Sequence, residues 1–417
     1  MKIAIVGSGI AGMTAARVLA RRNDVTLFEA AHYLGGHTNT VRIAEGGRTL
    51  AVDTGFIVFN ESNYPNLCAL FEEIGVESRE SDMSFSVHCE KTGVEYNGTS
   101  LATLFAQKRN LFRPRFWRML AEILRFNRDA LLALRRGIED TVTVAEYVEK
   151  NRHSKAFVEQ YLVPLGASLW SCDPHGFLRF PIRFVIEFLS NHAMLQVEGR
   201  PAWRTVVGGS DAYVGPLTAP YRDRIYVNTP VKAVIRVPAG VELTFGGGQR
   251  ERFDEVVLAC HADQSLRLLT NPDPEESEIL GHFPYQVNDA LLHTDTTVLP
   301  KRPTVWASWN YRIPAEAKGY VTVTYNMNML QGLQSTNTYC VSLNQSAHID
   351  ARKIIRRIRY EHPLFTPGRD HAQANHPLLI RRRGISYCGA YWGYGFHEDG
   401  VRSALAVCDS FDVSLAA

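Results

Sequence analysis

Three glycines near the start of the chain have the spacing of a phosphate-binding turn. Gly7, Gly9 and Gly12 form a GxGxxG motif directly after the apolar run 2–6. The first glycine permits a tight turn, the second lets the backbone approach a pyrophosphate, and the third lets a helix pack close to the strand. Glu29 follows 22 residues after Gly7, where a carboxylate accepts hydrogen bonds from ribose hydroxyls. These residues predict a dinucleotide-binding site.

The elements around the motif follow in the order that a dinucleotide fold requires. The run 2–6 is apolar and β-branched, which is typical of a buried parallel strand. Residues 13–22 predict a helix, and residues 25–28 predict a second strand that ends at Glu29. The free N–H groups and the positive dipole end of the helix would bind the phosphate. With every element present, we expect a bound ligand rather than an empty glycine-rich turn.

Two further glycine segments distinguish FAD from NAD. The segments 34–38 (LGGHT) and 52–56 (VDTGF) follow Glu29 closely. They resemble the second glycine pair and the DxG segment of the flavin amine oxidase, phytoene desaturase and protoporphyrinogen oxidase superfamily. That superfamily usually has Arg where this chain has His37. The resemblance implies FAD, and the substitution changes one expected phosphate contact.

The same resemblance continues along nearly the whole chain. The segments that carry it are 207–210, 225–235, 253–259, 387–391 and 397–404. It implies that the backbone of Val231 meets the adenine and that a helix beginning at 398–400 directs its N-terminus at the flavin. The backbone N–H groups of that helix, rather than its side chains, are the expected contacts.

The motif and the resemblance together assign a set of residues to the cofactor. They are Gly7, Gly9, Ile10, Ala11, Gly12, Glu29, Ala30, Gly35, Gly36, His37, Thr38, Gly55, Phe56, Val231, Gly389, Ala390, His397, Glu398, Asp399, Gly400 and Val401.

A narrower resemblance concerns the end of the chain. The segments 361–367 (EHPLFTP) and 393–400 (GYGFHEDG) are similar to a bacterial family of predicted flavoproteins. Members are often associated with cyclopropane and methyl-branched fatty-acid synthesis. This resemblance makes a hydrophobic small molecule or lipid chain the leading substrate class.

The expected catalytic residues are His397 and Tyr394. Amine oxidases place an aromatic Tyr just before the flavin-facing helix, where this chain has His397. Histidine has a reference pKa of about 6.5, which suits a general base near neutral pH. The alternative is a histidine that caps the helix or bonds backbone. Cys388 lies on the last strand itself and does not match the cysteine that tethers flavin in some relatives, so we expect noncovalent FAD.

Side chains in the second half of the chain are candidates for the substrate cavity. Lys301 is a candidate for the lysine that often lies near flavin N5 in this superfamily, although no motif supports it. Trp306, Trp309 and Tyr325 are candidates for the cavity wall, with plain core packing as the alternative.

The expected fold class is α/β, with a Rossmann-like FAD-binding domain of the glutathione-reductase type. An inserted substrate domain, amine-oxidase-like, is expected to contain a mixed sheet and helices. The FAD-binding domain is expected at 1–75, 195–265 and 380–417, and the substrate domain at 76–194 and 266–379. Residues 100–190 predict helices, and 285–345 predict strands, including 320–325 at period two. Residues 351–360 predict a short basic helix that ends before Pro363.

Composition limits the classes of partner and compartment. The formal net charge is +2, which gives no indication of a nucleic-acid partner. The seven cysteines are dispersed without a CxxC pair, which favours reduced thiols in the cytoplasm. A secretory leader is the alternative for the apolar start, but Gly7, Gly9 and Gly12 interrupt it. The sequence predicts no metal site and does not specify the oligomeric state.

Local charge is uneven in residues 108–136. Nine Lys and Arg residues against two acidic residues give this segment a charge of +7, and large apolar residues are interleaved. A basic amphipathic helix can lie on an anionic membrane surface, which would make the protein membrane-peripheral. The alternative is a solvated helix whose other face lies in the core.

Three functional hypotheses remain. Residues 245–249 lack the spacing of a second dinucleotide motif, so electrons would come from the organic substrate and leave to oxygen or another acceptor. The leading hypothesis is dehydrogenation or desaturation of a lipid-like substrate at FAD. The second is amine or polyamine oxidation, which would need converging carboxylates that 100–190 and 285–345 do not show. The third is a flavoprotein without net redox, such as an isomerase or a lipid-binding partner of a methyltransferase.

Overall fold

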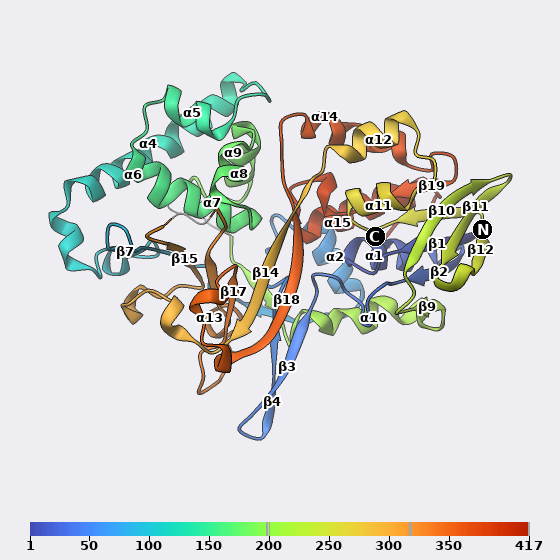
Figure 1. Cartoon of the computed structure of the whole chain (residues 1–417), viewed down its shortest axis with the longest axis horizontal. Coiled ribbons are helices and arrows are strands. Elements are labelled where there is room, and N and C mark those ends of the chain that lie inside the picture. Colours follow the sequence, from blue (N-terminus) through green and yellow to red (C-terminus); the bar gives the residue numbers. More distant parts are fainter. Residues whose placement is uncertain (197–198, 200, 317–318, 416–417) are drawn as a thin grey trace.

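The computed structural model has two units built around separate sheets, and both chain termini lie with the first of them (Figure 1). The structure describes residues 1–196, 199, 201–316 and 319–415. Residues 197, 198, 200, 317, 318, 416 and 417, which fall in the predicted segments 195–265, 266–379 and 380–417, lie outside the described residues. Among the described residues, no helix is both long and apolar enough to cross a membrane.

The first unit contains a five-stranded parallel sheet. Its strands, in spatial order, are β19 (Ile385–Tyr387), β13 (Glu255–Leu258), β1 (Lys2–Val6), β2 (Asp24–Phe28) and β9 (Ile225–Tyr226). Both faces are covered, which is why these strands are nearly continuous apolar runs. Ile3 and Ile5 face one core cluster, whereas Ala4 and Val6 face the other.

Helices cover one face of this sheet and a small antiparallel sheet covers the other. The helices are α1 (Ile10–Leu19), α2 (Pro65–Glu73), α10 (Val214–Thr218) and α15 (His397–Asp409). The small sheet is β10 (Val231–Val237), β11 (Gly240–Phe245) and β12 (Arg250–Phe253). The segment 245–249 is the turn between β11 and β12. This arrangement confirms the predicted fold class of the FAD-binding unit.

The core of the first unit extends past the expected domain boundaries. Helices α11 (Ala262–Leu268) and α12 (Pro274–Gly281) pack into the same cluster as β10–β12. Ala372 of α14 (Arg369–Ala374) and Leu379 also lie in this cluster. The nucleotide unit therefore includes residues beyond 265 and before 380.

The second unit contains a seven-stranded mixed sheet. Its strands, in spatial order, are β18 (Ile354–Pro363), β14 (Tyr285–His293), β17 (Cys340–Leu343), β16 (Val323–Asn326), β15 (Trp309–Ile313), β6 (Phe85–Cys89) and β7 (Val94–Asn97). Within the described strands of this sheet, only the β15–β6 pair is parallel. The structure also has two small antiparallel sheets of two strands each. They pair β3 (Thr40–Glu45) with β4 (Arg48–Asp53), and β5 (Ser78–Glu80) with β8 (Arg204–Val206).

Helices form the predicted insert at 100–190, and they lie at the far end of the molecule from the termini (Figure 1). They are α3 (Leu101–Leu104), η1 (Lys108–Phe112), α4 (Pro114–Arg136), α5 (Val144–Lys150), α6 (Lys155–Phe157), η2 (Val158–Leu162), α7 (Val163–Trp170), α8 (Pro174–Leu178) and α9 (Ile182–Asn191). The short helix α13 (Met327–Gln331) follows β16.

The predicted helix at 351–360 is wrong. Only the 3₁₀ turn η9 (Ala351–Lys353) is helical there, and the chain continues as the ten-residue strand β18. β18 pairs with β14 from Tyr285↔Pro363 to His293↔Ile354. It is an edge strand, so its exposed arginines and terminal Pro363 are tolerated. The hydrogen bonds and side-chain packing between β18 and β14 therefore override the local preference of this segment for a helix.

Candidate functional site

The glycine turn after β1 leaves no room for larger residues at two of its positions. Gly7 has a φ of +105°, and a Cβ there would lie 2.8 Å from the carbonyl oxygen of Ala259. A Cβ on Gly12 would lie 2.0 Å from the carbonyl oxygen of Gly7. Gly9 differs, because a Cβ there would meet no atom within 4 Å and would point into open space that lines a cavity. The turn is therefore tight on its protein side and open on its ligand side.

The second glycine pair closes against the first. The backbone N–H of Gly35 donates to the carbonyl oxygen of Ser8 at 3.1 Å. A Cβ on Gly36 would lie 3.4 Å from the Cα of Gly9. The segments 7–12 and 34–38 thus form one continuous backbone wall.

Glu29 is held at this wall by several donors. Its Oε2 accepts from the backbone N–H of Ser8 at 2.9 Å and from the Ser8 hydroxyl at 2.6 Å. Its Oε1 accepts from the N–H of Ala31 at 2.8 Å. A carboxylate has about four acceptor positions, so the oriented side chain keeps capacity for a ligand hydroxyl.

Asp53 joins three distant segments beneath the site. Its Oδ1 accepts from the Thr40 hydroxyl at 2.6 Å and from the N–H and hydroxyl of Ser210 at 2.8 and 2.9 Å. Its Oδ2 accepts from Nε2 of Gln331 at 2.8 Å. Burial raises the pKa of Asp53 to about 6, although these hydrogen bonds lower it. The residue links the DxG segment to the 207–210 segment and to α13.

His37 presents an unsatisfied polar atom to the cavity. Its Nε2 is buried without a hydrogen-bond partner, and the side chain lines the cavity. The carbonyl oxygen of His37 accepts from the N–H of Phe56 at 2.8 Å, and only a glycine at 55 permits that approach. The position that has Arg in the superfamily is therefore still directed at the ligand space.

A group of aromatic and imidazole rings surrounds His37. Its ring stacks on Tyr360 at 4.8 Å between centroids, with His362 at 5.2 Å and His261 at 6.4 Å. Burial and then the neighbouring histidines lower the pKa of His37 well below its usual value. Burial also lowers the pKa of His362 to about 4. His37 and His362 are therefore neutral at physiological pH.

The helix α15 begins with His397, which is fixed from several sides. Its Nε2 lies 3.1 Å from the Thr38 hydroxyl and 3.1 Å from the Tyr213 hydroxyl, and Thr38 and Tyr213 are themselves hydrogen-bonded. Its ring stacks on Phe56 at 3.6 Å between centroids. Burial lowers the pKa of His397 to about 3. These contacts favour a positioning role over the general base that the sequence suggested.

The next residues of α15 make contacts within the protein. The carboxylate of Glu398 accepts from the N–H of Leu67 at 3.0 Å and from Nδ2 of Asn66 at 2.5 Å. Asp399 Oδ2 accepts from the N–H groups of Tyr394 and Phe396. The N–H groups of Asp399 and Gly400 both donate to the carbonyl oxygen of Phe396. Two of the three expected backbone donors therefore already have acceptors, because the helix closes its first turn on Phe396.

Tyr394 lies just before α15, and its ring packs against the helical insert. The ring stacks on Phe184 at 5.2 Å, and Nδ2 of Asn191 donates to its hydroxyl at 3.4 Å. Burial raises the pKa of this hydroxyl, which keeps it protonated. Tyr394 borders the cavity, and its hydroxyl is hydrogen-bonded to α9.

One cavity of about 1200 Å³ connects the glycine turn to the second unit. Most of the residues predicted for the cofactor line it, as do both predicted catalytic residues. The predicted cofactor residues that do not line the cavity lie behind its wall: Gly12, Thr38, Glu398, Asp399, Gly400 and Val401.

Aromatic side chains form the wall of the cavity in the second unit. Trp309 and Tyr325 lie there, as the sequence suggested, with 4.8 Å between their ring centroids and 86° between their ring planes. The indole N–H of Trp309 is buried without a hydrogen-bond partner. Two other suggestions are wrong. Trp306 donates its indole N–H to the carbonyl oxygen of Pro300, and Lys301 lines a separate small cavity, because the loop between β14 and β15 turns away from the site.

Sequence reasoning missed several residues at the site. Tyr213, Tyr360 and His362 form its aromatic and imidazole surroundings. Tyr213 and Tyr360 lie in no recognisable motif, and His362 lies in the segment 361–367, whose resemblance assigned no role to this side chain. Glu80 and Asp82 also line the cavity, outside the two inserts in which acidic residues were sought. Their positions near β5 gave no local signal.

The comparisons with known proteins agree with this geometry. The model of the family "Flavin containing amine oxidoreductase" matches residues 10–339. The chain belongs to this family. Its class is that of FAD-binding oxidoreductases, as the glycine turn, Glu29 and the two-unit fold had predicted.

A curated relative and two solved structures show the range of similar proteins. Tryptophan 2-monooxygenase of Allorhizobium ampelinum is 25% identical over 342 residues, which cover 71% of this chain and 44% of that protein. Cyclohexylamine oxidase from Brevibacterium oxydans has a TM-score of 0.69 at 15% identity and 99% coverage of both chains. A fatty acid isomerase from P. acnes that produces CLA has a TM-score of 0.66 at 15% identity and 98% coverage of both chains. The two structures share the fold of this chain.

Proposed function

We propose that the protein dehydrogenates or desaturates a hydrophobic, fatty-acyl or lipid-like substrate at noncovalently bound FAD. The observation that carries this proposal is the single cavity of about 1200 Å³ that runs from the glycine turn to an aromatic wall. It exceeds the range of about 300–1,000 Å³ for sites that hold one small ligand, so it has room for a cofactor and a substrate.

The residues at the turn fit FAD. Gly9 has open space where a side chain would project, and Nε2 of His37 is a buried polar atom in need of a partner. The backbone of segments 7–12 and 34–38 would bind the pyrophosphate, and Glu29 would bind a ribose. The N–H groups of His397 and Glu398 are the first-turn donors of α15 left for the flavin edge. When bound, FAD would accept two electrons from the substrate and pass them to oxygen or another acceptor.

The chemistry of the cysteines supports a noncovalent cofactor. Among the described residues, Cys260 is the cysteine that lines the cavity. Its Sγ donates to the carbonyl oxygen of Val6 at 3.2 Å, and burial raises its pKa to about 12. A thiol in this state is a poor nucleophile. Cys388 is fully buried behind the wall. Acid denaturation should release the flavin into the supernatant, and flavin retained on the precipitate would contradict this.

The wall supports a hydrophobic substrate. Trp170, Phe188, Trp309, Phe365 and Phe396 line the cavity. Such a wall binds an apolar chain by excluding water and gives few polar contacts. The proteins that share this fold include one that acts on a fatty acid, which makes a lipid chain compatible with the scaffold.

An amine substrate is the second candidate, and it has its own supporting observation. Glu80 and Asp82 line the cavity and could pair with a cationic amine. Asp82 is already engaged, because its Oδ1 accepts from the N–H of Ser84 at 3.0 Å and from the Ser308 hydroxyl. Glu80 would therefore have to supply most of the recognition.

Anaerobic titration of the FAD-loaded protein distinguishes these candidates. Lipids that co-purify with the protein are extracted and added back, beside a long-chain fatty acid and a diamine. Bleaching of the main visible flavin band by the lipids supports the proposal. Bleaching by the diamine alone would favour the amine candidate. Turnover of a lipid with unchanged flavin colour would instead indicate isomerisation, and the redox proposal would be abandoned.

A further inference from the structure

The helical insert exposes large apolar side chains and hides polar ones at η1. Gln107 and Asn110 are 1% and 0% exposed, whereas Phe112 is 85% exposed and Leu111 is 44% exposed. This is the reverse of the usual distribution for a water-facing segment. The exposed apolar residues need an explanation that the core does not give.

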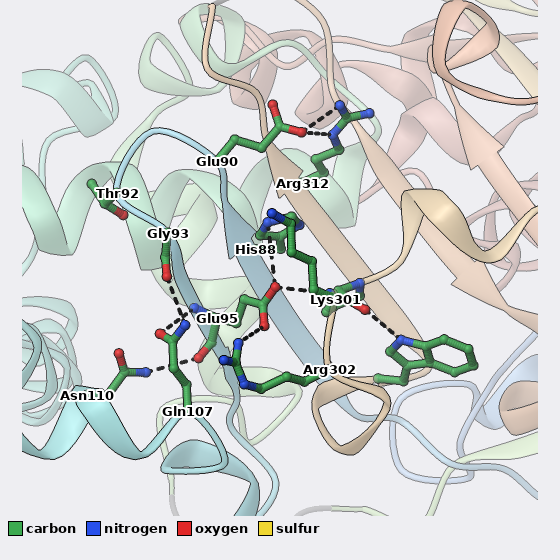
Figure 2. A network of polar contacts seen from close by, with 12 residues as sticks. His88, Glu90, Thr92, Gly93, Glu95, Gln107, Asn110, Lys301, Arg302 and Arg312 are labelled. Carbon is green, nitrogen blue, oxygen red and sulfur yellow. Dashed lines mark hydrogen bonds and ion pairs between the residues drawn. The ribbon is translucent and has the colours of Figure 1, made fainter.

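A polar network fixes η1 in this orientation, and Figure 2 shows Glu95 within it. The N–H of Glu95 donates to Oε1 of Gln107 at 3.2 Å, and Nδ2 of Asn110 donates to the carbonyl oxygen of Glu95 at 3.0 Å. The carboxylate of Glu95 accepts from the N–H of Lys301 at 3.0 Å and from Arg302 at 2.8 Å. These bonds attach η1 to β7 and to the loop before β15.

The exposed apolar residues form one surface with the outer face of α4. The indole N–H of Trp117 donates to the carbonyl oxygen of Leu111 at 2.9 Å, and the Trp117 ring lies 5.1 Å from that of Phe105. Leu124 is two helical turns after Trp117 and points the same way. We call this surface the outer platform. It consists of Leu101, Leu111, Phe112, Trp117 and Leu124.

Positive charge surrounds the outer platform. Lys108, Arg109, Arg115, Arg118 and Arg128 are exposed around it. Both acidic residues of the segment have a basic partner: Glu122 is buried, accepts from Ser154 and pairs with Arg118 at 3.3 Å, and Asp129 pairs with Arg128 at 3.0 Å. Most of the basic residues counted in the +7 charge of 108–136 are therefore exposed, in the same segment as exposed apolar groups.

We propose that the outer platform docks the protein on an anionic lipid bilayer. Apolar side chains would enter the boundary between headgroups and acyl chains while the arginines pair with lipid phosphates. Long basic side chains suit this position, because their stems lie along the apolar layer and their charges reach the phosphates. The inner face of α4, with Phe116, Met119 and Phe126, packs in the core, so the helix lies on the surface and does not insert across it.

This docking is separate from the flavin site, since none of the platform residues lines the large cavity. Failure of the docking proposal would therefore leave FAD content and flavin reduction intact, whereas failure of the proposed function would leave vesicle binding intact.

The test is cosedimentation of the FAD-loaded full chain with vesicles of phosphatidylcholine alone or mixed with phosphatidylglycerol. The triple variant Leu101→Ser, Phe112→Ser and Leu124→Ser should lower partitioning onto mixed vesicles by about tenfold or more. The variant Arg115→Gln, Arg118→Gln and Arg128→Gln should lower it by about tenfold on mixed vesicles only, and salt should mimic this change. The matched control is Leu378→Ser, because Leu378 is an exposed apolar residue (54%) outside the platform.

Unchanged FAD content and melting temperature will show that each variant is folded. Binding of the wild type that ignores phosphatidylglycerol and salt would overturn the proposal, as would wild-type partitioning by the triple variant or an equal loss in Leu378→Ser. A wild-type dimer that the triple variant converts to monomer would also overturn it, because a second copy of the chain would then cover the platform.

Discussion

The two halves of the cavity are built in different ways. On the nucleotide side, the wall is mainly backbone from short consecutive segments, and the critical residues are glycines whose missing side chains make the space. On the substrate side, the wall is side chains from strands and helices that are far apart in sequence. The first half therefore tolerates no larger residue at Gly7 and Gly12, whereas the second can change its specificity one ring at a time.

The largest effect expected from this difference is within the glycine turn. Gly12→Ala places a methyl group 2.0 Å from the carbonyl oxygen of Gly7, so the turn must distort. We expect loss of FAD together with a stability loss of about 1–3 kcal/mol or more. Gly9→Ala is the matched control, because its Cβ meets no protein atom and fills only ligand space. It should weaken FAD binding while the melting temperature of the apoprotein stays unchanged. Equal melting temperatures for the two variants would show that the turn is not constrained as described.

The next effect concerns Glu29. Glu29→Ala should weaken FAD binding by about 1.5–3 kcal/mol, because hydrogen bonds to a charged group are lost. It should also destabilise the apoprotein, since the N–H groups of Ser8 and Ala31 lose their acceptor. Equilibrium dialysis of FAD and thermal unfolding without FAD measure the two effects separately. Wild-type affinity in the variant would remove Glu29 from the cofactor site.

A pH-dependent effect is expected at the boundary between the halves. The pKa of His397 is about 3 in the folded protein and about 6.5 when unfolded, so the unfolded state binds the proton more tightly. This contribution to stability is fully present above pH 6.5 and falls as the pH decreases. His397→Phe removes this pH-dependent contribution. The free energy of unfolding of the variant should therefore rise by about 2 kcal/mol relative to that of the wild type as the pH falls from 6.5 to 5.

The other buried histidines titrate in both proteins and cancel in this comparison. Denaturant unfolding at several pH values measures the difference between wild type and His397→Phe. The lost bonds to Thr38 and Tyr213 give a constant offset, so only the slope with pH is diagnostic. If the free energies of unfolding of the two proteins changed in parallel with pH, His397 would be accessible to protons in the folded protein and could still serve as the base.

The smallest effect is expected in the aromatic wall. Trp309→Phe keeps a ring in the wall but removes the buried N–H that lacks a partner in the protein. If substrate accepts that bond, KM should rise by about fivefold, with FAD content unchanged. A change in FAD content would show that the two halves of the cavity are less separable than the structure indicates.

The sequence predicted the nucleotide half well because its signals are local. The turn at 7–12 and the strand that ends at Glu29 each follow from spacing within a few residues. The helix that the resemblance implied from 398–400 begins one residue earlier, at His397. Asp53 shows what local signals omit. Its segment was recognised, but its hydrogen bond to Gln331 joins residues 278 positions apart and leaves no pattern in either segment.

The substrate half was harder for the same reason. The isoleucines of 351–360 have helical spacing, yet β14 offered a strand partner that only the tertiary structure reveals. Lys301 was suggested for the flavin by its residue type, whereas its backbone N–H bonds Glu95, 206 residues earlier, in a different part of the unit. Residue type limits the chemistry that a side chain can do, but here it did not locate the side chain.

The long pair β14 and β18 has a mechanical consequence. The two strands are paired at nine positions, and a ten-residue strand spans about 33 Å. At one end, on the nucleotide side, the Tyr285 hydroxyl accepts from the N–H of Ala262 in α11 at 3.2 Å. Leu292, near the other end, lies in the core of the mixed sheet. The pair acts as a strut between the units (Figure 1). A clamshell opening would have to separate the Tyr285 hydroxyl from Ala262 and the Tyr285 ring from His261, on which it stacks at 4.4 Å between centroids. We therefore expect substrate exchange to proceed through movements of loops and side chains at the cavity mouth.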